Sequence, residues 1–210
     1  MIITVDGPSG VGKGTLVRRL AQHYGFAWMD TGLLFRRVAY VLVQQQGDPQ
    51  SQADILKAAD QIGTTQSLPS AVFRTETISR LASQISTCAA LREKILQIIR
   101  QFADAEGNTL FDGRDMGTVV FPNADRKIFL TASAHIRAKR RLKDLENQGL
   151  SGDFEDILVN IQERDLRDAT RPIAPTKPAS DAFVVDTSHL SIEEVFNKCV
   201  SFIDQGAEIL

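Results

Sequence analysis

The sequence predicts an α/β fold built on a five-stranded parallel sheet flanked by helices. Two observations predict it: short apolar segments alternate with longer segments of helical periodicity, and a glycine-rich loop joins the first strand to the first helix. Parallel strands need crossover connections, which the helical segments are long enough to supply. Strands are expected at residues 2–6, 26–29, 109–112, 127–130 and 182–186, and helices at 13–24, 134–148 and 191–203.

The first strand leads directly into a loop with the features of a phosphate-binding site. The loop consists of Gly7, Pro8, Ser9, Gly10, Val11, Gly12, Lys13, Gly14 and Thr15. Glycines let successive backbone N–H groups turn inward around an anion, and the following helix directs its positive end at that anion. The alternative, a glycine-rich turn that binds nothing, leaves Lys13 and its spacing from Gly12 unexplained. A nucleotide is therefore the expected ligand.

The loop departs from the general pattern at the residue after the lysine. Gly14 stands where a hydroxyl would help to hold Mg²⁺, and the hydroxyl follows one position later, at Thr15. We expect phosphates and waters to dominate the coordination shell of the metal.

A long segment, about residues 32–106, separates the second and third strands. Apolar residues recur at helical spacing in four parts of it, with breaks at 47–49 and 67–70. The helices are expected at 31–46, 52–62, 75–87 and 90–105. An insert of this size on a nucleotide-binding core is expected to serve the second substrate.

The third strand ends in a motif that combines charge with backbone freedom. Asp112 stands at the carboxyl end of the strand, where it could orient Mg²⁺ or its waters. Gly113 and Gly117 permit a tight turn that presents Arg114 and Asp115. A surface turn with a local ion pair is the alternative.

Two later helical segments carry basic clusters. The first contains Arg137, Lys139, Arg140 and Arg141, and the second contains Arg164, Arg167, Asp168 and Arg171 on one helix face. The second face could close over phosphate oxygens. Both clusters could equally be solvated helix surfaces with weak local ion pairs.

Composition limits the function classes. The chain has 210 residues, of which 43% are hydrophobic and 24% charged, and a formal net charge of −2. This size fits a single domain over 1–210 that carries the insert. General nucleic-acid or anionic-membrane binding relies on a large positive field, which this charge does not provide.

The cysteines and the chain start give expectations about location. Cys88 and Cys199 are too few for a disulfide framework and lack metal-ligand spacing, so we expect reduced thiols. The first strand begins almost at once, which leaves no room for a signal peptide, and no apolar run approaches a membrane span. A cytoplasmic monomer is expected.

Together these segments resemble the bacterial cytidylate kinases, a branch of the nucleoside monophosphate kinases. The resemblance covers nearly the whole chain, and the block at 112–122 is its most specific part. The other matching segments are 6–15, 29–32, 35–36, 74–76, 82–84, 91–93, 127–130 and 163–171. The implied fold is a P-loop kinase with a helical nucleoside-monophosphate-binding insert and a short lid at about 149–171.

The resemblance implies three sets of acceptor-binding residues. The cytosine base would be read by Thr31, Arg92 and Asp115. The acceptor phosphate would lie among Arg36, Arg114 and Arg171, and the sugar would contact Arg164 and Asp168. Carboxylate and guanidinium partners distinguish cytosine from uracil by hydrogen-bond polarity.

The implied reaction is in-line transfer of the ATP γ-phosphoryl group to CMP or dCMP, which gives CDP or dCDP. Charge on the transferring group would be stabilised by Mg²⁺, the loop amides, and the side chains of Lys13, Arg137, Arg164 and Arg171. Asp112 would act on the metal through water. The family's insert usually includes a small antiparallel sheet, but residues 63–73 are few and include Pro69, so this sheet is expected to be reduced or absent.

Other functions remain open at this point. A non-catalytic nucleotide-binding regulator could keep the pocket without turnover, and a kinase for another small acceptor would not need Arg92 and Asp115. A GTP-hydrolysing switch shares the phosphate loop, but the sequence contains no Asn-Lys-x-Asp segment for guanine recognition.

Overall fold

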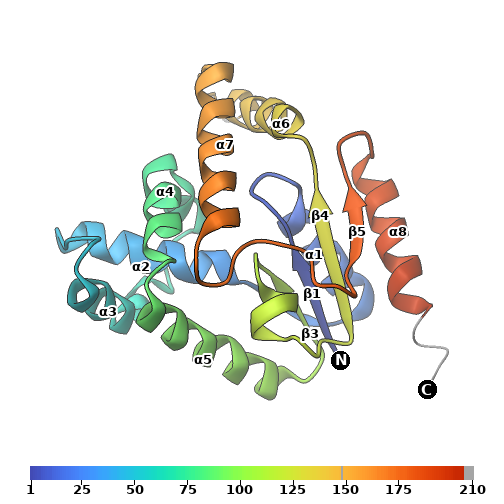
Figure 1. Cartoon of the computed structure of the whole chain (residues 1–210), viewed down its shortest axis with the longest axis horizontal. Coiled ribbons are helices and arrows are strands. Elements are labelled where there is room, and N and C mark those ends of the chain that lie inside the picture. Colours follow the sequence, from blue (N-terminus) through green and yellow to red (C-terminus); the bar gives the residue numbers. More distant parts are fainter. Residues whose placement is uncertain (148, 206–210) are drawn as a thin grey trace. The chain divides into compact units, whose positions relative to one another are not determined.

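The five strands form one sheet in a computed structural model of the chain, which describes residues 1–147 and 149–205. The strand order is β2-β3-β1-β4-β5, and β1 pairs in parallel with β3 and β4, as β4 does with β5 (Figure 1). The strands are β1 (Ile2–Asp6), β2 (Ala27–Asp30), β3 (Thr109–Asp112), β4 (Arg126–Thr131) and β5 (Phe183–Asp186). The predicted α/β class is confirmed.

Helices connect the strands in chain order. The helices are α1 (Lys13–Tyr24), α2 (Thr31–Gln44), α3 (Gln52–Asp60), α4 (Glu76–Ile85), α5 (Ala89–Glu106), α6 (Ala134–Asn147), α7 (Phe154–Thr170) and α8 (Ile192–Asp204). Three short helical turns are η1 (Ile62–Thr65), η2 (Ser70–Arg74) and η3 (Met116–Val120). No helix within 1–147 or 149–205 is both long enough and apolar enough to cross a membrane.

Most predicted boundaries differ from the observed ones by one or two residues, for local reasons. Phe26 precedes β2 because its N–H donates to Ala21 O at 3.0 Å and so belongs to the end of α1. Ser191 precedes α8 because its hydroxyl accepts from the Glu194 N–H as an N-cap. The helix predicted for 134–148 ends at Asn147, and position 148 lies outside the described residues.

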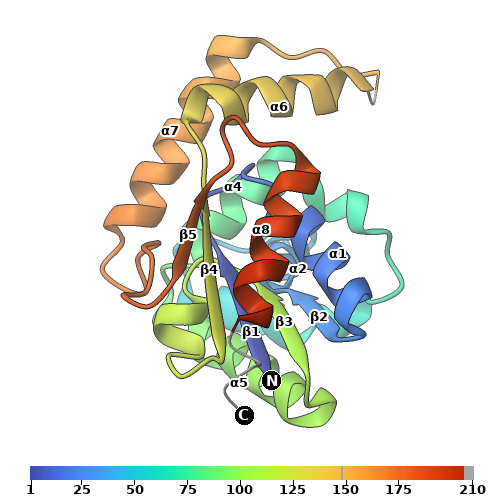
Figure 2. The same ribbon diagram turned by 90° about the vertical axis from the view of Figure 1, so that its right-hand side faces the viewer.

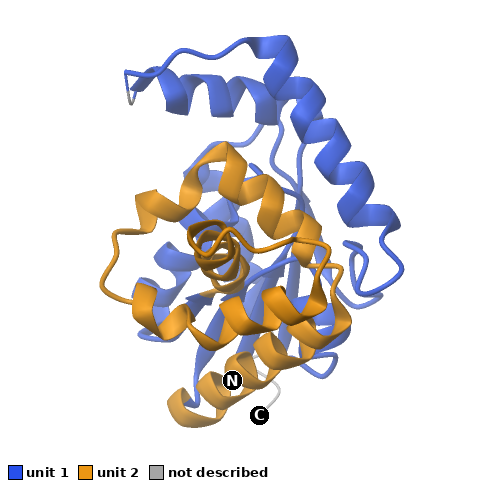
Figure 3. Ribbon diagram, turned by 90° about the vertical axis from the view of Figure 1, so that its left-hand side faces the viewer, with its two compact units in different colours: residues 1–29, 107–210 blue, residues 30–106 orange. Residues whose placement is uncertain are grey.

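The chain forms two compact units, which Figure 3 colours separately. The first comprises residues 1–29 and 107–210 and contains β1, most of β2 and the other strands, with α1 and α6 to α8. The second, Asp30–Glu106, consists of α2 to α5 with η1 and η2. All of 63–73 is described and contains no strand, in agreement with the expected loss of the small sheet.

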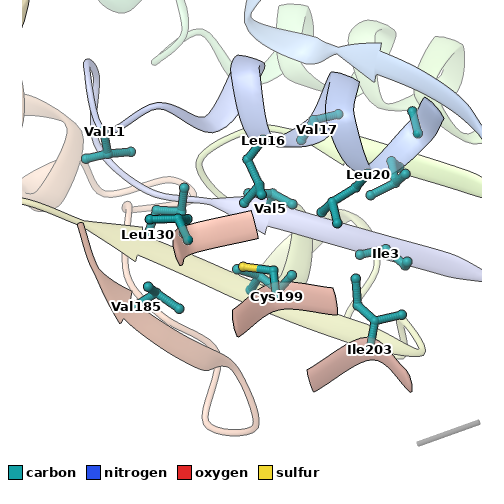
Figure 4. Packing of buried hydrophobic residues seen from close by; sticks show 14 of the residues in the cluster. Ile3, Val5, Val11, Leu16, Val17, Leu20, Leu130, Val185, Cys199 and Ile203 are labelled. Atoms are coloured by element: carbon teal, nitrogen blue, oxygen red, sulfur yellow. The ribbon is translucent and has the colours of Figure 1, made fainter. Parts of the chain in front are cut away.

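The main core of the first unit lies between the sheet and the helices α1 and α8, which Figure 2 shows side by side. Ile3 and Val5 of β1 point into it, and Leu20 of α1 and Ile203 of α8 meet them (Figure 4). Side chains alternate along a strand, so Thr4 faces the opposite side of the sheet, where η3 packs. This alternation fixes the direction of the next residue on that side, Asp6.

The core predicts a large difference between two leucine truncations. Leu20 is fully buried in α1, whereas Leu166 of α7 is 66% exposed. Leu20→Ala should lower the free energy of unfolding by about 3 kcal/mol, because it removes buried apolar atoms and leaves a cavity. Leu166→Ala should change it by less than about 0.5 kcal/mol. Urea denaturation followed by circular dichroism measures both, and equal losses would contradict the assigned core.

Candidate functional site

The phosphate loop has the backbone that anion binding requires. Gly7, Gly10 and Gly12 all adopt positive φ, at 144°, 79° and 98°, a conformation that residues with a Cβ atom rarely adopt. At Gly7 a Cβ atom would come within 2.1 Å of the Leu130 carbonyl oxygen, so the loop begins in direct contact with β4. Helix α1 starts at Lys13, so its first turn contains the last three residues of the loop and its N-terminus points at the glycine-rich part.

Lys13 is folded back across this loop. Its Nζ donates to Gly7 O at 2.9 Å and to Pro8 O at 2.8 Å, and its side chain is only 6% exposed. Burial, reinforced by the nearby Arg114 guanidinium, lowers the pKa of Lys13, and the Asp112 carboxylate opposes this effect. Phosphate oxygens in the loop would favour the charged ammonium, so the lysine is arranged to respond to an anion.

Asp112 forms an ion pair with Lys13, with 3.9 Å between Asp112 Oδ1 and Lys13 Nζ. It sits at the carboxyl end of β3, in register with Val5 of β1. A Cβ on Gly14 would lie 3.4 Å from Asp112 Oδ2, in van der Waals contact, so the glycine leaves this carboxylate oxygen uncovered on that side. The described residues contain no group of three metal-binding side chains. A single carboxylate fits a Mg²⁺ ion whose other ligands are phosphates and waters.

The segment after β3 carries two of the predicted acceptor residues. Arg114 Nε lies 3.4 Å from Asp168 Oδ2, and Arg171 Nη2 lies 3.6 Å from Asp115 Oδ1. Both side chains of the second pair are at most 5% exposed. These contacts bring the turn after β3 together with the end of α7.

Helix α7 supplies a further predicted residue to the same cluster. Arg164 lies 3.7 Å from Asp168 at the i,i+4 spacing, and its Nη1 donates to Ser9 Oγ of the phosphate loop at 3.3 Å. Arg171 is the residue after the helix, with ψ 140°, so the prediction that it shares a helix face with Arg164 was wrong. The helix ends at Thr170, and Arg171 reaches Asp115 from the following extended segment.

Arg137 connects three parts of the first unit. Its guanidinium donates to Ala132 O at 3.0 Å, to Ser9 O at 3.1 Å and to Asp165 Oδ1 at 3.0 Å, with a second bond to Asp165 Oδ2. Its side chain is 4% exposed. The bidentate pair with Asp165 joins α6 to α7, and the bond to Ser9 joins both to the phosphate loop.

The second unit contains the remaining predicted residues. Asp30 caps α2 by accepting from Leu33 N–H, and its Oδ2 accepts from Arg36 at 2.8 Å and from Arg74 at 3.1 Å. Arg92 donates to Ser86 O at 3.3 Å and lies over the Phe35 ring at 5.8 Å. Thr31 is buried at the first turn of α2.

Sequence reasoning gave no role to three acidic residues that make defined contacts within their own units. Asp6 accepts two backbone N–H groups of the turn after β3, Asp30 joins Arg36 and Arg74, and Asp165 holds Arg137. The available signal was position: Asp6 and Asp30 each end a strand, where the carboxyl edge of a parallel sheet gathers functional groups. Asp165 carried no such signal, because its partner lies on another helix.

Comparisons with known proteins identify the family to which the chain is similar. A family model described as cytidylate kinase matches residues 3–205. The chain is 43% identical over 223 aligned residues to a cytidylate kinase of Mannheimia succiniciproducens, with 100% of this chain and 98% of that one covered. It is 42% identical to cytidylate kinase 1 of Haemophilus influenzae, with 98% and 94% covered.

Solved structures support the fold alone. A shikimate kinase from Bacteroides thetaiotaomicron superposes with a TM-score of 0.52 at 12% identity, and 100% of this chain and 99% of that one are covered. A protein from Eubacterium ventriosum superposes with a TM-score of 0.57 at 14% identity, with coverages of 97% and 98%. The predicted P-loop kinase fold is confirmed.

The bidentate pair at Arg137 predicts a specific loss of stability. Asp165→Asn removes the charge that faces a buried guanidinium, so it should lower the free energy of unfolding by about 2 kcal/mol. Asp156→Asn, on the exposed face of the same helix, makes the same chemical change and should alter it by less than about 0.5 kcal/mol. Urea denaturation compares the two variants. Similar losses from both would mean that the Arg137 pair contributes little.

Proposed function

Because this chain belongs to the cytidylate kinase family, we propose that it transfers the γ-phosphoryl group of ATP to CMP or dCMP and so produces CDP or dCDP. One observation carries the proposal beyond family membership. Within the first unit, Lys13 and three arginines, Arg114, Arg137 and Arg164, gather around a glycine loop that opens a helix. Such a cationic arrangement suits the charged phosphates of a nucleoside triphosphate.

No protein nucleophile is needed for this reaction, because the acceptor phosphate already supplies an anionic oxygen. Catalysis then consists of aligning two mutually repelling anions and stabilising the charge on the transferring group. The loop amides and Lys13 bind the donor phosphates. Arg137 and Arg164, which both contact Ser9, are placed to neutralise charge as it develops beside the loop.

Acceptor recognition is assigned to residues of both units. Arg114 and Arg171 of the first unit and Arg36 of the second are proposed to bind the acceptor phosphate, and Arg164 and Asp168 its sugar. Thr31, Arg92 and Asp115 are proposed to read the base. The buried Asp115 carboxylate would accept from the exocyclic amine of cytosine, whereas uracil has a carbonyl there, and two acceptor oxygens would face each other.

Mg²⁺ is proposed to act with ATP, held by phosphates, waters and the Asp112 carboxylate. A bound cation of this kind neutralises charge on the phosphates and fixes their orientation. We further propose a cytoplasmic monomer without nucleic-acid or membrane partners, since the formal net charge of −2 offers no general attraction to polyanions.

A panel of acceptors tests the proposal against a kinase for another small molecule. CMP and dCMP should be phosphorylated with kcat/KM values at least about 100-fold above those for AMP, GMP and UMP, because a wrong base leaves buried polar groups unsatisfied. A coupled assay for ADP measures each acceptor. A preference for AMP, GMP or UMP would overturn the base assignment.

The role of Lys13 separates an enzyme from a non-catalytic regulator. Lys13→Ala should lower kcat by about 100-fold or more, because it removes a cation from the transferring phosphates. The matched control is Lys139→Ala, which removes an exposed lysine of α6 and should leave kcat unchanged. If the parent chain itself binds ATP without detectable transfer, the regulator interpretation is correct.

A further inference from the structure

Asp6 is a buried carboxylate between the phosphate loop and the turn after β3. It is the last residue of β1, directly before Gly7, and is only 4% exposed. One carboxylate oxygen accepts from the Met116 N–H at 2.9 Å and the other from the Gly117 N–H at 2.7 Å. Both acceptor atoms of the carboxylate are therefore used on one short stretch of backbone.

Close packing holds the same stretch against β1. A Cβ on Gly117 would come within 2.9 Å of Thr4 Oγ1, and Thr4 shares the strand face of Asp6. Gly113 N–H donates to Val5 O at 3.1 Å. The backbone is thus fixed to β1 at Gly113 on one side and at Met116 and Gly117 on the other.

Arg114 and Asp115 are the two residues between these fixed points. Their side chains meet Asp168 and Arg171 at the end of α7. We propose that Asp6 is a positioning residue for acceptor binding: its two carboxylate oxygens fix the backbone that carries Arg114 and Asp115. This inference rests on the proposed function, in which those side chains bind the acceptor phosphate and base.

An ionised carboxylate at this position lowers the stability of the folded chain, so its presence suggests a functional reason. The pKa of Asp6 is raised to about 7, mainly because the carboxyl is buried and to a smaller extent because Asp115 lies nearby, although the two amides and Lys13 oppose the rise. A group whose pKa is raised on folding destabilises the folded state as pH increases through its unfolded value toward the folded one. At pH 8 the protein therefore carries a buried charge that a neutral isostere would avoid.

Asparagine cannot reproduce the two bonds, although it has the same shape. Its amide offers one acceptor oxygen, while its NH₂ group would face a backbone N–H that also donates. In Asp6→Asn the turn must move at either Met116 or Gly117. The variant consequently loses acceptor placement without losing stability, a combination that a purely structural role would not produce.

Steady-state kinetics at pH 8 test this with the full chain. In Asp6→Asn the KM for CMP should rise about tenfold, the change expected when the acceptor loses one charge-assisted hydrogen bond to the displaced turn. The KM for ATP should stay within about twofold. The urea midpoint of unfolding should not fall. The control is Asp125→Asn, which changes an exposed carboxylate that accepts from Ile2 N–H at the opposite end of β1. It should leave both KM values unchanged.

The outcomes distinguish this proposal from the proposed function. A parent chain that does not phosphorylate CMP refutes the function itself. If the parent does phosphorylate CMP, two results for Asp6→Asn refute the role of Asp6. The first is an unchanged KM for CMP. The second is a rise in the KM values for both CMP and ATP together with a lower urea midpoint. If Asp6→Asn does not fold, amide exchange in the parent decides: Met116 and Gly117 N–H should be strongly protected, and rapid exchange of either would overturn the proposal.

Discussion

The concentration of positive charge around the phosphate loop is the constraint on which the first unit depends. Cations that are to bind phosphates repel one another before any ligand arrives, and burial adds to the penalty. The structure answers this by giving the central cations acidic partners: Asp112 for Lys13, Asp165 for Arg137 and Asp168 for Arg114 and Arg164. This pairing allows several cations to gather around one loop in a chain of net charge −2.

The same pairing determines geometry as well as charge. Each carboxylate has at least one cation on a different element, so the pairs join β3 to α1, α7 to α6 and α7 to the turn after β3. The second unit repeats the arrangement independently, with Asp30 between Arg36 and Arg74 at the start of α2. Arginine suits this use, because its planar group can bond a carboxylate and still present further N–H groups to a phosphate.

The sequence predicted the parts of the fold that depend on local patterns. The predicted bounds of α1 are confirmed, and the structure shows why the helix ends there: Gly12 and Gly25 adopt left-handed conformations on either side of it. The predicted end of α2, at residue 46, lies two residues after the observed end at Gln44. Gln46 adopts positive φ, which cannot be predicted from its residue type. The partners of Asp6 and Asp165 were not predictable, because each contact joins residues at least 28 positions apart. Such contacts follow from packing, which a single sequence does not display.

The contact between Gly7 and Leu130 has a consequence for how the loop adapts to different ligands. With a Cβ at Gly7 only 2.1 Å from a main-chain oxygen of β4, the base of the loop has no spare volume in which to shift. A Cβ at Gly12, by contrast, would meet no atom within 4 Å. The space in which the loop could adjust between a diphosphate and a triphosphate therefore lies toward Gly12, next to α1, whereas the end at Gly7 is packed tightly against β4.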